Sequence, residues 1–246
     1  GIEEFKIVRG NTLSNPGLLE NDELKKFNVI LANPPYSIKS WDRSAFENDP
    51  YGRNLWGTPP QGCADYAFQQ HIQKSLDPKN GRSISLWPHE ILFRESEGEM
   101  RRKMVENDLV ECVIGLGPNL FYNSPMEACL LITRNNKPQN SKGKILFINA
   151  VNEVKQEKTI GYLLENHINK IFSAYKDYQS IANFAVLVDK EEVLSRGGNM
   201  AINLYVRPES LEHKEHVSFE DAYQNWEQQG KLLSNSMNEL FDLIGK

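Results

Sequence analysis

The sequence predicts an α/β fold: a mostly parallel β-sheet followed by a helical extension at the C-terminus. Through residue 150, short apolar runs alternate with segments whose apolar residues recur at helical spacing. Strands that alternate with helices are typical of a parallel sheet with helices on both faces. After residue 150 the alternation weakens, and the chain closes with a long helical pattern.

The first predicted elements are two short strands separated by polar residues. Residues 5–8 (Phe-Lys-Ile-Val) are predicted as a strand that ends in a turn at residues 10–13. An apolar run at residues 28–32 predicts the second strand. Residues 37–62 follow without periodicity and are rich in Gly, Pro, Asn and aromatic residues. Structureless loops of this length in compact domains are usually disordered or cover an active site, and the aromatic residues favour a lid.

The middle of the chain alternates helices with strands. The predicted elements are, in order, a helix at 65–76, a strand at 83–87, a helix at 95–108, a strand at 109–114, a loop at 115–125 and strands at 128–133 and 145–149. The polar residues between the last two strands predict a hairpin or a crossover. We expect the last strands to be antiparallel.

We expect three parts in the chain, at residues 1–150, 151–210 and 211–246. The first part holds the sheet. The second is a small α/β extension with a helix at 159–178. The third is a helical tail, in which Gln-Gln-Gly at 228–230 leaves open one helix or two. The apolar spacing of this tail favours contact with partner subunits.

Charge and hydropathy narrow the classes of function. The net charge of the 246 residues is −5, whereas a protein that holds DNA alone usually carries a basic stripe. The densest basic run, Arg101-Arg102-Lys103, is expected on a solvent-exposed helix face. No apolar run reaches the roughly 18 residues that span a bilayer. Residues 1–4 show no signal-peptide core, so we expect a cytoplasmic protein without a membrane segment.

The cysteines and histidines do not form a metal-binding pattern. Cys63, Cys112 and Cys129 are far apart, and the five histidines have no ligand spacing with them. Cys112 and Cys129 lie in apolar strand patterns, so we expect them to be small core residues. We therefore assign no metal site.

The most informative motif is Asn33-Pro34-Pro35-Tyr36, which directly follows the strand at 28–32. Each proline fixes its own φ and restricts the residue before it, so this turn has few conformations. The Asn33 side chain and the Pro34 carbonyl are two rigid acceptors beside an aromatic ring. Such a set can hold an exocyclic amino group of a flat heterocycle. The simpler alternative is a strand-ending turn in which Asn33 forms local hydrogen bonds.

In their order, several motifs resemble the N6-adenine DNA methyltransferase (M) subunit of type I restriction-modification systems. The similar segments are residues 27–36 (Phe-Asn-Val-Ile-Leu-Ala-Asn-Pro-Pro-Tyr), 64–72 (Ala-Asp-Tyr-Ala-Phe-Gln-Gln-His-Ile), 81–86, 91–94 (Ile-Leu-Phe-Arg), 117–122 (Gly-Pro-Asn-Leu-Phe-Tyr), 184–206 and 217–222. The resemblance covers nearly the whole chain. Asn-Pro-Pro-Tyr alone is moderately specific, whereas the ordered set is strong.

The resemblance implies a Rossmann-like, S-adenosylmethionine-dependent methyltransferase core within residues 1–150. Its implied activity is site-specific methylation of DNA at adenine N6. The implied partners are DNA, a specificity (S) subunit, a second M subunit and, where one exists, a restriction (R) subunit. The implied catalytic residues are Asn33, Pro34, Pro35 and Tyr36; the target base stacks on Tyr36, Phe121 and Tyr122; and the cofactor contacts Asn11, Thr12, Leu13, Asn33 and Asp65.

Simpler roles remain open for several of these residues. Asn11 is typical of a turn after a strand, and Asp65 suits the first turn of a helix without any ligand. Core packing is the alternative for Phe121 and Tyr122. For Asp65 the structural role is the favoured one.

The sequence departs from the family pattern at one point. The Gly-rich cofactor loop of these methyltransferases is missing before Asn33, and Asn11 stands where an Asp is more usual. We therefore expect an N-terminally incomplete fold that is inactive alone and does not bind the cofactor. Two alternatives stay open: a protein-glutamine or RNA-base N-methyltransferase with the same tetrapeptide, and a non-catalytic remnant.

Overall fold

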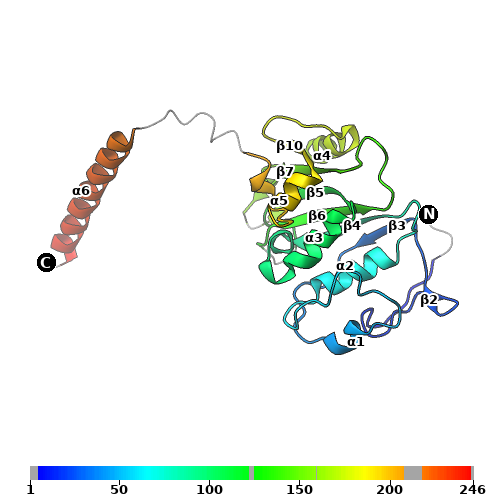
Figure 1. The fold of residues 1–246 in the computed structure, drawn as a ribbon. Helices are drawn as coiled ribbons and strands as arrows, with labels where there is room; N and C mark the ends of the chain where they lie inside the picture. Colours follow the sequence, from blue (N-terminus) through cyan, green and yellow to red (C-terminus); the bar gives the residue numbers. More distant parts are fainter. Residues whose placement is uncertain (1–4, 122–124, 159, 208–217, 245–246) are drawn as a thin grey trace. The chain divides into compact units, whose positions relative to one another are not determined.

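Figure 1 shows the computed structural model of the chain, which describes residues 5–121, 125–158, 160–207 and 218–244. The chain divides into two compact units, Gly1–Arg207 and Pro208–Lys246. The first unit contains the β-sheet, and the second contains the C-terminal helix. The boundaries expected at residues 150 and 210 stay a prediction.

The first unit is organised around a six-stranded sheet with the order β10-β7-β5-β6-β4-β3. Its strands are β3 (Val29–Ala32), β4 (Arg82–Pro88), β5 (Val110–Leu116), β6 (Ala128–Arg134), β7 (Lys144–Ala150) and β10 (Ala185–Asp189). The β3–β4 and β5–β7 pairings are parallel, whereas β4–β6, β5–β6 and β7–β10 are antiparallel.

The sheet is therefore mixed, and the prediction of a mostly parallel sheet holds only in part: β3, β4, β5 and β7 run in one direction, but three of the five pairings are antiparallel. Apolar patterning records burial and not strand direction, and β6 lies antiparallel between β4 and β5. Since β7 pairs with β5 and not with β6, residues 135–143 form a crossover instead of a hairpin. The antiparallel pairing expected near the end of the sheet is present between β7 and β10.

The remaining elements of the first unit connect and cover the sheet. Its helices are α1 (Arg43–Glu47), α2 (Asp65–Lys74), α3 (Gly98–Glu106), α4 (Glu165–Asp177) and α5 (Lys190–Ser195), with 3-10 turns η1 (His89–Leu92), η2 (Glu95–Glu97) and η3 (Ile202–Leu204). Two small hairpins are β1 (Leu19–Glu20) with β2 (Glu23–Leu24) and β8 (Lys155–Glu157) with β9 (Ile160–Tyr162). Residues 37–62 are mostly irregular, as expected, apart from α1.

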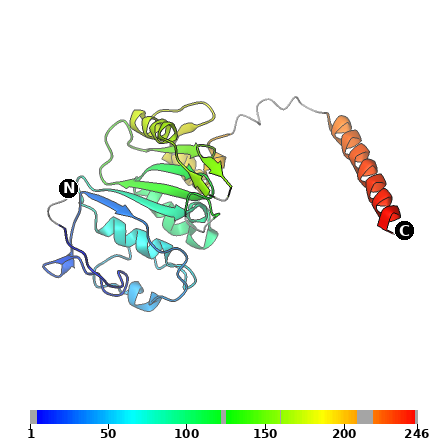
Figure 2. The ribbon, with the colours of Figure 1, turned by 180° about the vertical axis from the view of Figure 1, so that it is seen from behind.

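Helices cover both faces of the sheet, with α4 on one face and α2, α3 and α5 on the other (Figures 1 and 2). Alternate strand residues point to opposite faces. Phe147 packs with the α2 and α3 side chains, whereas its neighbour Leu146 packs on the α4 side. Every residue of the central strand β5 is buried. Cys112 and Cys129 are fully buried, which confirms their prediction as core residues.

The strand β3 forms one edge of the sheet, and one of its faces is bare. Val29 and Leu31 are 56% and 74% exposed, while Ile30 and Ala32 pack against the core. The strand predicted at residues 5–8 is wrong, because this segment is irregular, with Phe5 76% exposed. A strand needs a neighbour for its backbone hydrogen bonds. Within the described residues, β3 pairs only with β4, and residues 5–8 pair with no strand.

The two helices predicted after residue 150 can be compared with the structure. The helix expected at 159–178 begins only at Glu165, because part of the preceding segment forms the β8–β9 hairpin. In the second unit, α6 (Phe219–Ile244) is one continuous helix that passes through Gly230, so the single-helix alternative holds. Among the described residues, no helix has the length and apolar character needed to cross a membrane.

Candidate active site at the carboxyl end of β3

Four strands of the sheet have their carboxyl ends at the same end of the sheet, which we call the carboxyl edge. β3 is parallel to β4, β5 is parallel to β7, and β6 is antiparallel to both β4 and β5. β3, β4, β5 and β7 therefore run in one direction. In open α/β sheets, ligands bind beyond the carboxyl ends of such strands. The Asn33–Tyr36 turn follows β3 at this edge, and the segment 117–121 follows β5 at the same edge.

The turn after β3 presents Asn33 to solvent and keeps Tyr36 partly buried. The Tyr36 hydroxyl donates a hydrogen bond to Asn33 Oδ1 over 2.8 Å. The ring centroid of Tyr36 lies 6.3 Å from that of Trp87, at an interplanar angle of 47°. Burial raises the pKa of the Tyr36 hydroxyl, which keeps it a donor. The bond identifies the oxygen end of the Asn33 amide, and it orients that oxygen within the turn.

The backbone leaves this turn in a strained conformation that a buried carboxylate holds. Ser37 has a φ of 50°, in the left-handed region that non-glycine residues rarely adopt. Its amide donates to Asp65 Oδ1 over 2.7 Å. Asp65 is the first residue of α2 and is 0% exposed. Asp65 therefore links the start of α2 to the end of the Asn33–Tyr36 turn.

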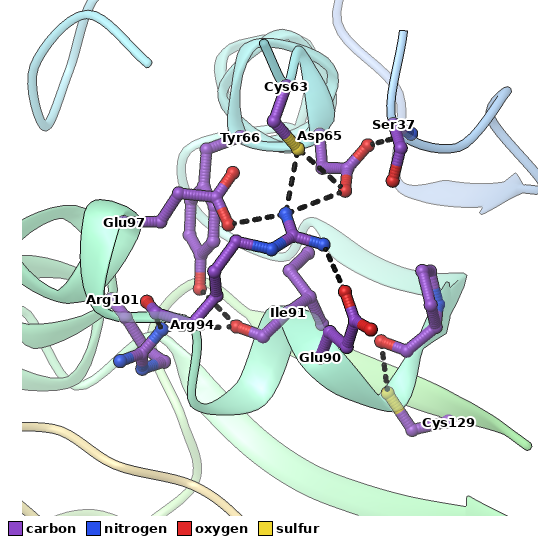
Figure 3. Close-up of polar contacts among 11 residues, drawn as sticks. Ser37, Cys63, Asp65, Tyr66, Glu90, Ile91, Arg94, Glu97, Arg101 and Cys129 are labelled. Carbon is purple, nitrogen blue, oxygen red and sulfur yellow. Dashed lines mark hydrogen bonds and ion pairs between the residues drawn. The ribbon is translucent and has the colours of Figure 1, made fainter. Parts of the chain in front are cut away.

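A cluster around Arg94 occupies the other side of the Asp65 carboxylate (Figure 3). Arg94 Nη1 lies 3.2 Å from Asp65 Oδ2, 2.9 Å from Glu97 Oε2 and 2.7 Å from Cys63 Sγ. Arg94 Nη2 donates to the exposed Glu90 over 3.0 Å. Glu97 is 0% exposed, and burial raises the pKa of its carboxyl group. Burial also raises the pKa of the Cys63 thiol, to about 12, so the sulfur stays protonated.

This cluster contains three ligand types that metals use. Atoms of Cys63, Asp65 and Glu97 lie within 4.8 Å of one another. Arg94 Nη1 contacts all three residues, so its positive charge occupies the place that a cation would need. The arrangement is an internal ion-pair cluster that supports the turn.

The predicted stacking residues are only partly described. Phe121 is half-buried and packs at the margin of the core cluster on the α4 side, where Tyr36 also packs. Tyr122 lies outside the described residues. Tyr36 and Phe121 thus come from segments far apart in sequence and border one core cluster.

The predicted cofactor residues 11–13 form a turn that a buried arginine anchors. Asn11 Oδ1 accepts hydrogen bonds from the backbone of Leu13 (3.0 Å) and Ser14 (3.3 Å), as its interpretation as a turn former expects. Arg53 donates to the carbonyls of Thr12 (2.8 Å) and Leu13 (2.7 Å). Arg53 is 2% exposed and pairs with Asp49 at 2.5 Å. The lid-like segment 37–62 is therefore tied to residues 12–13.

Two cavities flank this turn. One, of about 310 Å³, is lined by Gly10, Thr12 and His71 among others. The second, of about 130 Å³, is lined by Asn11, Leu13 and Tyr51 among others. In this arrangement Thr12 faces one cavity, and Asn11 and Leu13 face the other.

Sequence reasoning missed the arginines that organise the site. Arg101 was expected on an exposed helix face, but it is 3% exposed and donates to backbone carbonyls of Gly198 (3.0 Å) and Arg94 (3.0 Å). A buried arginine is satisfied here by carbonyls, which no sequence pattern records. The Arg94 cluster left a weak signal, since Glu90 and Glu97 stand four residues before and three residues after Arg94. Ser37 left none.

Comparisons with known proteins identify the family. The profile described as N-6 DNA Methylase matches residues 1–214. The methylase subunit of the type I restriction enzyme MjaVIII from Methanocaldococcus jannaschii is 32% identical in an alignment of 253 positions, which covers 99% of this chain and 42% of that protein. The HindI methylase subunit from Haemophilus influenzae is 36% identical over 141 residues, covering 56% of this chain and 29% of that protein.

A solved structure supports the same assignment. The methyltransferase subunit of a type I restriction-modification system from Streptococcus thermophilus superposes with a TM-score of 0.73 at 33% identity. The match covers 80% of this chain and 41% of that one. This chain thus spans less than half the length of these relatives, and its resemblance to type I methylase subunits is confirmed. The chain belongs to the N-6 DNA methylase family.

Proposed function

We propose that this chain is part of a modification subunit that methylates adenine N6 at specific DNA sites. The observation that carries the proposal is the proline-fixed turn at the carboxyl edge of the sheet, where Asn33 is exposed and its Oδ1 is oriented by Tyr36. The family match supports adenine N6 as the acceptor. The activity of the whole protein belongs to this proposal, because the chain covers 42% of its relative from Methanocaldococcus jannaschii.

The turn suits the chemistry of an aromatic amine. The lone pair of adenine N6 is delocalised into the ring, so N6 is a poor nucleophile. We place one N6 hydrogen on Asn33 Oδ1 and the other on the Pro34 carbonyl, which favours a tetrahedral nitrogen. An amide oxygen has two lone pairs, so Asn33 Oδ1 accepts this hydrogen while it also accepts the Tyr36 hydroxyl.

The turn then stabilises charge that develops during transfer. S-adenosylmethionine, which the family uses, supplies the methyl group on a positively charged sulfur. N6 would become positively charged when it accepts the methyl group, and it would afterwards lose one proton to solvent. The two fixed acceptors stabilise that charge without reorganising. Pro34 and Pro35 contribute by limiting the motion of both acceptors.

The target base has to leave the DNA duplex to reach this turn, and unstacking costs a few kcal/mol. We assign Tyr36 and Phe121, with Tyr122, to receive the base. Stacking on an aromatic side chain contributes about 1–3 kcal/mol per base, which offsets much of the cost. The rings of Tyr36 and Phe121 are partly buried beyond the carboxyl ends of β3 and β5, in accordance with this role.

The residues that would hold the cofactor fit it only in part. Thr12 lines a cavity of about 310 Å³, which is at the lower end of the range for small-molecule sites. Asn11 and Leu13 line the smaller cavity, so one ring does not reach all three residues in this arrangement. We keep Asn11, Thr12, Leu13 and Asn33 as proposed cofactor contacts. Asp65 is fully buried with both oxygens engaged, so we assign it to support of the turn.

Partner subunits complete the proposal. DNA, a specificity subunit, a second modification subunit and, where one exists, a restriction subunit are the proposed partners. The helix α6 exposes large apolar side chains along its length, among them Phe219 (81%), Trp226 (71%) and Leu233 (63%). Exposed apolar side chains of this size usually mark a contact surface. We therefore assign α6 to subunit contacts. The net charge of −5 agrees with a partner subunit that supplies much of the contact with DNA.

The test compares Asn33→Ala with wild type in the intact modification subunit. Adenine-unmethylated DNA and radiolabelled S-adenosylmethionine are supplied, with and without the specificity subunit. We expect kcat to fall roughly 100-fold or more, as for the loss of one preorganised catalytic group. A wild-type kcat in the variant would refute the assignment. Methylation of RNA or of a glutamine-containing peptide, with none of DNA, would favour the alternative substrate classes.

A separate measurement tests whether the chain acts alone. We expect no binding of S-adenosylmethionine by these 246 residues in calorimetric titration. Binding at micromolar concentration would show that these 246 residues form a sufficient cofactor site. Loss of methylation in a complex that contains the whole subunit would favour the non-catalytic alternative.

A further inference from the structure

The turn that presents Asn33 is held from outside by one carboxylate. Ser37 follows Tyr36 directly, and its amide donates to Asp65 Oδ1 over 2.7 Å. The other oxygen of Asp65 accepts from Arg94 Nη1 at 3.2 Å and from the Cys63 thiol at 3.0 Å. Figure 3 shows the Asp65 carboxylate between Ser37 on one side and Arg94 on the other.

We propose that Asp65, held by Arg94, is a positioning residue for methyl transfer: it locks the turn in the shape that presents Asn33 and Tyr36 to the target base. This inference rests on the proposed function. It assigns Asp65 to the geometry of the acceptors and not to contact with the cofactor or the base.

The backbone conformation of Ser37 shows why the turn needs the hydrogen bond to Asp65. The left-handed conformation, with a φ of 50°, is less favourable than the right-handed one for a residue with a side chain. Such a conformation persists when surrounding contacts determine it. A short bond to a buried carboxylate supplies that contact. Because Tyr36 is the adjacent residue and its hydroxyl orients Asn33 Oδ1, a change at Ser37 moves both groups.

Arg94 is needed because Asp65 is 0% exposed. A buried carboxylate without a cation is strongly unfavourable. The backbone carbonyl of Arg94 accepts from Arg101 Nη1 at 3.0 Å, and Arg101 Nε donates to the Gly198 carbonyl at 3.0 Å. Asp65 and Arg94 are thereby connected to the loop after α5. A rigid support of this kind keeps catalytic groups within the small tolerance that transfer requires.

The first variant is Asp65→Asn in the intact modification subunit. The amide replaces one of the two carboxylate oxygens by an NH2 donor, which then faces either the Ser37 amide or Arg94 Nη1, and both of these are donors. We expect kcat for DNA methylation to fall roughly tenfold or more, in line with loss of a charged hydrogen bond. The dissociation constant for S-adenosylmethionine stays within about twofold, because a positioning residue acts on the transfer step and not on cofactor binding. The control is Glu99→Gln, which removes exposed ion pairs to Arg102 and Lys103, outside the Arg94 cluster; its kcat stays at the wild-type value.

A second variant tests whether Asp65 acts by holding the conformation of Ser37. Glycine adopts positive φ without strain, so Ser37→Gly in the Asp65→Asn background relieves the conformational cost. We expect it to restore kcat by about threefold over Asp65→Asn alone. A role of Asp65 in overall stability alone predicts no such rescue. Hydrogen exchange followed by mass spectrometry gives a readout independent of activity: the peptide containing Ser37 exchanges faster in Asp65→Asn.

The outcomes separate this inference from the proposed function. If the wild-type subunit methylates DNA and Asp65→Asn keeps its kcat, the positioning role is overturned, whatever the exchange rate. A loss of cofactor affinity that accounts for the whole loss of activity also overturns it. If the wild-type subunit, assembled with its specificity subunit, methylates no DNA, the proposed function fails, while the exchange measurement still reports whether Asp65 holds Ser37.

Discussion

Acidification is expected to destabilise the chain through His71, which lies in α2 beside the buried Arg53. His71 Nδ1 is 3.4 Å from Arg53 Nη1, so the neutral ring accepts from the guanidinium. A protonated ring would place a second positive charge there. The pKa of His71 is lowered from 6.5 to about 4, mainly by burial and also by the charge of Arg53, while Asp49 partly compensates.

The sign and size of the effect follow from this pKa. Between pH 6.5 and about 4, the unfolded chain binds a proton at His71 that the folded chain does not. The full stability is therefore present above pH 6.5 and is lost as the pH falls towards 4. The difference between the two pKa values corresponds to about 3 kcal/mol as an upper limit. Since His71 is partly exposed, about 2 kcal/mol is a better expectation.

Urea unfolding between pH 7 and pH 4.5, followed by circular dichroism, measures this effect. His71→Gln keeps a polar side chain of similar size that does not titrate in this range. Acid-induced losses from other groups are common to both proteins, so the difference between the two curves isolates His71. We expect the wild type to lose about 2 kcal/mol more than the variant over this range. Parallel curves for the two proteins would refute the reasoning.

Three further predictions concern buried charges. Arg53→Lys is expected to cost about 3 kcal/mol in urea unfolding at pH 7, because lysine cannot make the forked contacts to Asp49 and to two carbonyls; an unchanged midpoint would contradict this. Lys137→Met is expected to cost a similar amount, about 3 kcal/mol. The reason is that the Lys137 side chain is 0% exposed, pairs with Asp108 at 2.6 Å and donates to two carbonyls. A variant that unfolds at the wild-type temperature would contradict this prediction. For Glu97, burial raises the pKa of the folded state above 4.5. Between pH 4.5 and this raised pKa, the folded state holds a proton that the unfolded state has lost. Wild-type stability therefore falls as the pH rises from 4.5 through the raised pKa. Glu97→Gln removes that fall, which a pH series of unfolding curves detects.

Much of the fold could be predicted from the sequence because burial leaves a direct trace in it. The run before Asn33 and the alternation at 83–87 located β3 and β4, since both strands contribute to the core. The helix at 65–76 was predicted within two residues of its end. The turn after β3 was found because two prolines constrain the backbone in any surroundings.

The errors have physical causes that are not local. Residues 5–8 have strand-like composition, but a strand forms only beside another strand. The direction of β6 depends on its neighbours and not on its own residues. Arg101 is charged and yet buried, because carbonyls of Ile91, Arg94 and Gly198 surround its guanidinium. The support of the site by Asp65 depends on a backbone angle at Ser37, which arises only in the folded turn.

The order of strands has a kinetic consequence. Asn33 follows β3 and Phe121 follows β5, so they reach the same end of the sheet only when β4 and β6 pair in register between these two strands. The pairings that do this join residues far apart in sequence, such as Leu31 with Ile84 and Ser85 with Leu131. Pairings of this range slow folding, because the chain loses loop entropy before they form. Asn33 and Phe121 are therefore expected to reach their final positions only in the slowest refolding phase, after helical circular dichroism has recovered.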